Sequence, residues 1–368
     1  MKEGWRINTL KELSIISGDY GLSVPSKPFD GVRYLRITDI TDSGDLNDDK
    51  VSANIENDKK QEELQEGDVL FARTGATVGK TLVFRKEFGE CLYAGYLIRY
   101  RLNKDVILPR YMHYVTHSNE YYDWVATNQE AAAQSNISAK KYNLLPVRYP
   151  SIKEQQSIVD YLDSAFVKID AMKANAEKAL DEAKALFQAS LKEMLEPKEG
   201  WEEKTLGEIL NLRRGHDLTH SQMKGSDYPV AGSNGQIGTH NCCTPISPCI
   251  TVGRSGSVGA VNIYKECWAH NTTLYIDDFK GNYPKYLYYL LSSIDLAHLN
   301  SGSAVPTLNR NFIHPLIVPY IKDNNTQQSI VATLDSLKSK VDRLQENFDK
   351  ISQECDALKQ AILRKVFE

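Results

Sequence analysis

The sequence has no apolar run near the roughly 20 residues that a membrane-spanning helix needs, and its first residues lack the apolar core of a signal peptide. We therefore expect a cytoplasmic protein whose six cysteines stay reduced. Cys242, Cys243, Cys249 and Cys267 cluster in the sequence, but they lack the paired Cys-x-x-Cys spacing of zinc sites. We predict free thiols there and no bound metal.

Motifs of known catalytic sites are also missing. There is no His-Glu-x-x-His, no Gly-x-Ser-x-Gly and no Asn-Pro-Pro-Tyr type of methyltransferase motif. Residues 75–81 resemble a phosphate-binding loop, but Thr74 stands where the first glycine is required. The net charge of −4 shows no basic surplus. We predict a non-catalytic chain whose affinity for nucleic acid, if any, comes from local patches or from a partner that adds phosphate contacts.

What the sequence does contain is a duplication. The Gly-Trp segment at residues 4–13 returns at residues 200–209. Gln-Gln-Ser-Ile-Val at 155–159 returns at 327–331, and Leu-Asp-Ser follows each copy. The segments between these repeats differ strongly. We infer two matched frames that carry two unlike inserts, at residues 1–150 and 198–320.

Two long helices are predicted at residues 151–197 and 321–368. Ser151 and Glu154 form a capping-box pattern, and apolar residues then recur at steps of three and four in both segments. Each helix would be about 60 Å long. Small side chains in the first seam and large ones in the second favour an intramolecular coiled coil; the alternative is two helices packed on their own domains. The predicted seam comprises Leu162, Ile169, Met172, Ala176, Ala183, Leu186, Leu334, Leu337, Val341, Leu344, Phe348, Ile351, Leu358 and Ile362.

The inserts are predicted to be rich in strands and turns, which makes the fold class α+β. Residues 33–40 alternate like a half-buried strand, and proline-initiated helices are expected at 109–124 and 284–299. Arg73-Thr74-Gly75 in the first insert matches Arg254-Ser255-Gly256 in the second. Arg and Ser/Thr donate to phosphates and base edges, and glycine allows close approach. The alternative is a structural turn with an arginine on its surface.

Taken in order and in duplicate, these motifs resemble the specificity subunit of type I restriction–modification systems over nearly the whole length. The resemblance implies two target-recognition domains that each read half of a split, asymmetric DNA sequence. It also implies an antiparallel coiled coil that sets the half-site separation. Two methyltransferase subunits, which hold S-adenosylmethionine, would dock on the chain. A restriction subunit that uses ATP and Mg²⁺ would complete the complex, and this chain would carry no cofactor.

Candidate DNA contacts under this hypothesis are polar side chains in glycine- or asparagine-rich loops. They are Arg73, Thr74, Lys80, Gln134, Asn136, Lys140, Lys141, Arg213, Arg214, Asn234, Gln236, Arg254, Ser255, Asn309, Arg310 and Asn311. Two other classes of function remain open from the residues alone. The first class is a coiled-coil adaptor that organises two protein partners without reading DNA. The second is an enzyme with an unrecognised site.

Overall fold

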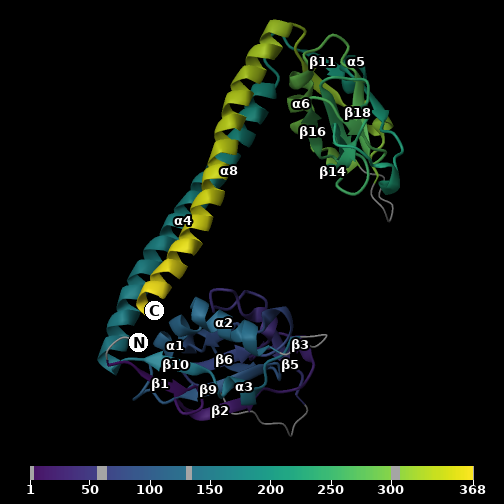
Figure 1. Ribbon diagram of the computed structural model, residues 1–368. Helices are drawn as coiled ribbons and strands as arrows, with labels where there is room; N and C mark the ends of the chain where they lie inside the picture. The colour runs from purple at the N-terminus through teal and green to yellow at the C-terminus, as the bar shows by residue number, and fades with distance from the viewer. Residues whose placement is uncertain (1–3, 56–63, 130–134, 300–306, 368) are drawn as a thin grey trace. The chain divides into compact units, whose positions relative to one another are not determined.

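The computed structural model describes residues 4–55, 64–129, 135–299 and 307–367 (Figure 1). The chain divides into two compact units. Unit 1 comprises residues 1–175 and 350–368, and unit 2 comprises residues 176–349. Each unit therefore contains one insert together with parts of both long helices.

In unit 1 a four-stranded antiparallel sheet, ordered β2-β9-β6-β7, forms the centre, and three two-stranded pairs, β1-β10, β3-β5 and β4-β8, flank it. The strands are β1 (Arg6–Thr9), β2 (Ser14–Tyr20), β3 (Ser26–Pro28), β4 (Arg33–Leu35), β5 (Val51–Ala53), β6 (Asp68–Ala72), β7 (Thr81–Val83), β8 (Cys91–Tyr93), β9 (Leu97–Leu102) and β10 (Pro146–Tyr149). The helices of this insert are η1 (Ile37–Asp39), η2 (Gly75–Thr77), η3 (Lys86–Phe88), α1 (Pro109–Val115), α2 (Asn119–Asn128) and α3 (Ala139–Tyr142).

Unit 2 repeats this frame. Its four-stranded antiparallel sheet has the order β12-β18-β15-β16, beside a three-stranded sheet β14-β13-β17 and the pair β11-β19. The strands are β11 (Glu202–Thr205), β12 (Asn211–Arg214), β13 (Tyr228–Gly232), β14 (Gly235–His240), β15 (Cys249–Gly253), β16 (Val261–Tyr264), β17 (Trp268–Ala269), β18 (Thr273–Asp278) and β19 (Ile317–Tyr320). The helices are α5 (Leu206–Ile209), η4 (His220–Gln222), α6 (Pro284–Ser292), η5 (Leu296–Leu299) and α7 (Arg310–Ile313).

The two long helices, α4 (Ile152–Leu195) and α8 (Asn324–Phe367), lie antiparallel in each unit (Figure 1, teal and yellow). In unit 1 the ammonium group of Lys173 lies 3.6 Å from the carboxylate of Asp356. In unit 2 the ammonium group of Lys184 donates to the Gln345 side chain at 3.0 Å. This pairing confirms the predicted packing of the helices on each other. In the described part of the chain, neither these helices nor the shorter ones combine the length and apolar character that a bilayer crossing requires.

Burial corrects part of the predicted seam. Met172, Leu186 and Leu358 are exposed, so these three predictions were wrong. Leu180 and Phe187 are buried instead. The sequence pattern admitted two adjacent apolar stripes, and packing against the partner helix and against each insert selects between them. The other predicted seam residues are buried or half-buried: Leu162, Ile169, Ala176, Ala183, Leu334, Leu337, Val341, Leu344, Phe348, Ile351 and Ile362.

The repeated glutamines anchor each long helix to its insert. Gln155 is fully buried, accepts from the Leu108 amide at 2.9 Å and donates to the Pro150 carbonyl at 3.0 Å. Gln327 is also fully buried; it accepts from the Tyr283 amide at 2.8 Å and donates to the Ile321 carbonyl at 2.7 Å. Each side chain thus joins the backbone before its own long helix to the backbone just before α1 or α6, so the repeated glutamine has the same structural role in both units.

The repeated Leu-Asp-Ser segments make a second anchor. Asp163 pairs with Arg110 of α1 at 2.6 Å, and Asp335 pairs with Lys285 of α6 at 2.6 Å. The Tyr114 hydroxyl of α1 donates to the Asp163 carboxylate, and the Tyr289 hydroxyl of α6 donates to the Asp335 carboxylate. Burial, together with the bond to Asp335, raises the pKa of Tyr289. In each unit, two side chains of the short helix therefore bind the aspartate of the long helix and fix where the long helix begins relative to its insert.

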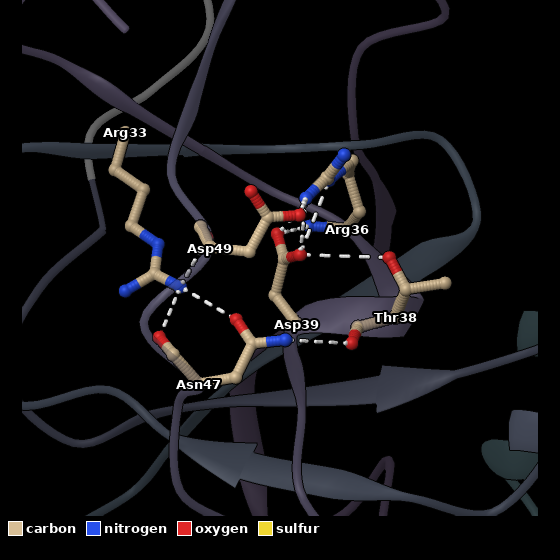
Figure 2. A network of polar contacts seen from close by, with 6 residues as sticks. All are labelled: Arg33, Arg36, Thr38, Asp39, Asn47 and Asp49. Atoms are coloured by element: carbon tan, nitrogen blue, oxygen red, sulfur yellow. Dashed lines mark hydrogen bonds and ion pairs between the residues drawn. The ribbon is translucent and has the colours of Figure 1, made fainter. Parts of the chain in front are cut away.

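The predicted strand at 33–40 is only partly correct. β4 ends at Leu35, and the chain then turns into η1. Asp39 is buried, and its carboxylate accepts from the Arg36 backbone amide at 2.8 Å and from the Arg36 guanidinium at 2.7 Å (Figure 2). This local bonding competes with a β-ladder and ends the strand.

The predicted helix at 109–124 is two helices. α1 ends at Val115, and Ser118 caps α2 by accepting from the Tyr121 amide. The predicted helix at 284–299 likewise ends at Ser292, and η5 follows it. In the first case a good N-cap residue sits where the apolar pattern alone continues, so capping decides the boundary.

Candidate nucleic-acid interface

The loop that follows β6 presents Arg73 at the end of a fully buried strand. The Arg73 amide donates to the Tyr96 carbonyl at 3.0 Å. The Arg73 carbonyl in turn accepts from the Ile137 amide at 2.9 Å. Backbone bonds on both sides therefore fix the position of this residue. Thr74 forms an isolated antiparallel bridge with Asn136, but Thr74 is buried and so offers little surface to a ligand, unlike its prediction as a DNA contact.

The Arg73 side chain is held on two sides. Its Nε donates to the Asn136 Oδ1 at 3.2 Å, and its guanidinium lies 4.9 Å from the centre of the Tyr20 ring. Within the described ranges, the terminal nitrogens of Arg73 have no hydrogen-bond acceptor. The fork that forms paired hydrogen bonds to a guanine edge or a phosphate is thus held in place and unoccupied.

The loop after β15 places Arg254 in the same way. Its amide donates to the Thr272 carbonyl at 2.8 Å, and its carbonyl accepts from the Leu308 amide at 2.8 Å. Ser255 bridges to Thr307, as Thr74 bridges to Asn136. Arg73 and Arg254 therefore have equivalent backbone positions in the two units.

The surroundings of Arg254 are different from those of Arg73. Its Nη1 lies 3.5 Å from the Asn271 carbonyl. The Asn271 amide group donates to the Asp217 carboxylate, and the Arg214 guanidinium donates to the same carboxylate at 2.8 Å. The hydrogen bond from Asn271, followed by the one from Arg214, lowers the pKa of Asp217. A chain of polar groups thus occupies the side of the loop where unit 1 has an aromatic ring.

A family model described as "Type I restriction modification DNA specificity domain" matches residues 2–181 and 198–353. The chain belongs to this family. The two matched segments cover both inserts and most of both long helices, in agreement with the duplicated frame. The resemblance that the sequence motifs indicate is therefore confirmed.

Two curated relatives are similar over part of the chain. The EcoBI specificity subunit of Escherichia coli is 27% identical over 188 residues, which are 50% of this chain and 38% of the relative. The EcoKI specificity subunit of Escherichia coli strain K12 is 30% identical over 178 residues, which are 46% of this chain and 38% of the relative. The aligned region thus spans less than two-fifths of the length of either relative.

Two solved structures share the fold. A chain from a study titled "Structural basis underlying complex assembly and conformational transition of the type I R-M system" has a TM-score of 0.79 and 18% identity, and the match covers 100% of this chain and 98% of that one. The HsdS subunit from Thermoanaerobacter tengcongensis has a TM-score of 0.55 and 17% identity, and the match covers 100% of this chain and 97% of that one. At these identities the likeness concerns the fold.

Several predicted contacts of this specificity-family chain already have protein partners. Lys80 pairs with Asp42 at 2.7 Å, and the Lys141 ammonium donates to the Asn128 carbonyl at 3.0 Å. The Arg310 guanidinium donates to a backbone carbonyl at 3.2 Å. In unit 2, Arg213 lies on β12 and is 4.0 Å from an aspartate. Arg214 pairs with Asp217 at 2.8 Å in the same way. Arg254 also has a backbone partner, so in the described ranges Arg73 is the predicted arginine whose terminal nitrogens have no acceptor.

The remaining predicted contacts differ in exposure. Gly253 and Gly256 bring the Arg254 loop against the Ser233 turn, beside the exposed Asn234. Lys140, Gln236, Asn309 and Asn311 are also exposed; Asn309 caps α7, and Gln236 donates to a nearby carbonyl. Gln134 lies outside the described residues. Tyr20, Asp217 and Asn271 were missed by the sequence analysis, because their contacts with the arginines are set by strand pairing.

In the described ranges, no three His, Cys, Asp or Glu side chains, including those of the cysteine cluster, are arranged to hold a metal ion. Cys249 and Cys267 are buried, and their sulfur atoms lie 2.8 Å apart. The bond to Cys249, together with burial, raises the pKa of Cys267. A protonated buried thiol is a poor nucleophile, which fits packing as its role.

Proposed function

We propose that this chain is the sequence-specific DNA-recognition subunit of a type I restriction–modification complex, in which each insert reads one half of a split, asymmetric target. One observation supports this most directly. Arg73 and Arg254 sit at equivalent backbone positions in unlike surroundings. A duplicated frame that offers two differently held arginines suits two half-sites of different sequence.

The partners in this proposal are double-stranded DNA and two methyltransferase subunits, with a restriction subunit in the larger complex. The methyltransferase subunits would supply S-adenosylmethionine, and the restriction subunit would use ATP and Mg²⁺. Our chain would carry no catalytic residue and no cofactor of its own. Its net charge of −4 fits a subunit whose partners contribute much of the contact with phosphates.

The test is to express the chain with its methyltransferase partner and to map methylated sites across a genome. We expect one split sequence with two unlike halves. The purified chain alone should show no methyl transfer or cleavage above an empty-vector control, and its affinity for DNA should be weak. Methylation with no common sequence would contradict a reading role, and stable binding of two protein partners without DNA affinity would indicate an adaptor.

A further inference from the structure

Each unit has a glycine that lies against a backbone carbonyl, Gly21 in the first unit and Gly215 in the second. The residue that precedes this glycine differs between the two units. A Cβ on Gly21 would lie 2.2 Å from the Tyr93 carbonyl oxygen, and a Cβ on Gly215 would lie 2.1 Å from the His270 carbonyl oxygen. Both positions therefore require glycine. The next residue forms an isolated parallel bridge in each unit, to Ala94 in the first and to His270 in the second.

These contacts place Tyr20 of unit 1 and Arg214 of unit 2 at equivalent positions. The match extends to the arginine loops, because the carbonyls of Tyr96 and Thr272, which accept from the arginine amides, belong to the second residue after the bridge partners Ala94 and His270. An aromatic side chain in one unit thus replaces a basic one in the other, next to equivalent arginines.

Tyr20 is itself held in place. Its hydroxyl oxygen accepts from the Ala139 amide at 2.9 Å, at the start of α3. The ring therefore has a fixed polar end and presents a face to the guanidinium of Arg73, 4.9 Å away. Asn136 holds the Nε edge of the same guanidinium. Ring and amide together remove rotamer freedom that Arg73 would otherwise lose on binding.

We propose that Tyr20 is a positioning residue that directs the Arg73 fork toward a base edge and so sets the specificity of the first insert. This inference rests on the proposed function. In unit 2 a hydrogen-bonded group takes the place of the ring: Arg214 and Asn271 both donate to Asp217. The Asn271 carbonyl accepts from Nη1 of Arg254. Different side-chain support at equivalent backbone positions would point the two arginines in different directions, and therefore toward different bases.

The experiment uses the complex of the full chain with its methyltransferase partner, and DNA duplexes carrying the mapped target or single base changes in either half-site. Tyr20→Leu removes the ring and keeps an apolar side chain. We expect discrimination at the half-site that depends on Arg73 to fall about three- to tenfold, the range of a partly exposed cation–π contact. Discrimination at the other half-site should stay unchanged. Tyr20→Phe keeps the ring and should retain most of the discrimination.

Two further variants separate this inference from the proposed function. Tyr20→Leu in an Arg73→Ala background should add no further loss, because Tyr20 acts through Arg73; an additional loss would overturn the positioning role. If Arg73→Ala lowers discrimination while Tyr20→Leu does not, the inference fails and the reading role of the loop stands. If Arg73→Ala changes nothing, the proposed role of the loop fails and this inference fails with it. A Tyr20→Phe complex as poor as Tyr20→Leu would show that the ring is not what directs the arginine.

Discussion

At the scale of single residues, the two arginine loops give the most direct test of DNA reading. Arg73→Ala should lower discrimination at one half-site and Arg254→Ala at the other, each by about 1–3 kcal/mol if the fork makes paired bonds to a base. The measurement is binding of the assembled complex to target and base-substituted duplexes. Arg85→Ala is a matched control in unit 1, because Arg85 pairs with Asp45 and Glu87 away from the loop. Equal losses on every sequence would mean that these arginines hold phosphates.

The buried glutamines test the anchoring of the long helices. Gln155→Leu leaves the Leu108 amide and the Pro150 carbonyl without their partner, which should lower the free energy of unfolding by about 2–4 kcal/mol. Chemical denaturation of the chain measures this loss. Gln156→Leu is the control, because the neighbouring Gln156 is exposed and its amide group donates to Asp160 within its own helix. Equal effects of the two substitutions would refute the anchoring role.

At the scale of elements, α1 gives the first unit a dependence on pH. Burial, reinforced by the nearby His117 and Arg110, lowers the pKa of His113 well below its usual value. The unfolded chain therefore binds a proton near pH 6.5 that the folded chain does not, so stability is full above that pH and falls as the pH drops further. Burial also lowers the pKa of His117, with the same sign.

The expected result is a loss of unfolding free energy as the pH falls from about 6.5 toward 5. His113→Gln should flatten this dependence, because glutamine does not titrate. Denaturation curves at several pH values provide the measurement. His298→Gln serves as the control, since His298 is exposed in η5. An unchanged slope in the His113→Gln chain would show that another group controls the response.

The arginine loops could be recognised in the sequence because both follow a buried strand with the same Arg-[Thr/Ser]-Gly motif. The supporting residues could not. Gly21 follows Trp5 by 16 residues, whereas Gly215 follows Trp201 by 14. β2 has two register shifts against β9, and each adds one residue to the strand. The bulges thus hide the equivalence of Tyr20 and Arg214 from any comparison by spacing.

At the scale of the whole molecule, both long helices run through the boundary between the two units without interruption. We predict that they set the spacing of the half-sites. Four residues inserted between Ala176 and Ala183 of α4, with a matched insertion between residues 345 and 356 of α8, add about 6 Å. At roughly 3.4 Å per base pair, the DNA spacer should lengthen by one or two base pairs while both half-sites stay the same.

Methylation mapping of the variant complex measures this change directly. Two inserted residues in each helix should instead break the heptad register and abolish methylation. An active four-residue variant with an unchanged spacer would show that the helices do not set the distance. An altered half-site sequence would show that spacing and reading are coupled.

The sequence by itself determined the duplicated frame, the two long helices, the α+β class and the two arginine loops. These features depend on local signals: periodicity, capping residues and glycines that repeat in the same order. Only the tertiary structure decided which apolar stripe of each helix is buried and where β4 ends. It also decided which side chains hold Arg73 and Arg254. Those outcomes depend on contacts between residues far apart in the chain, such as Tyr20 with Ala139, whose partners no local pattern specifies.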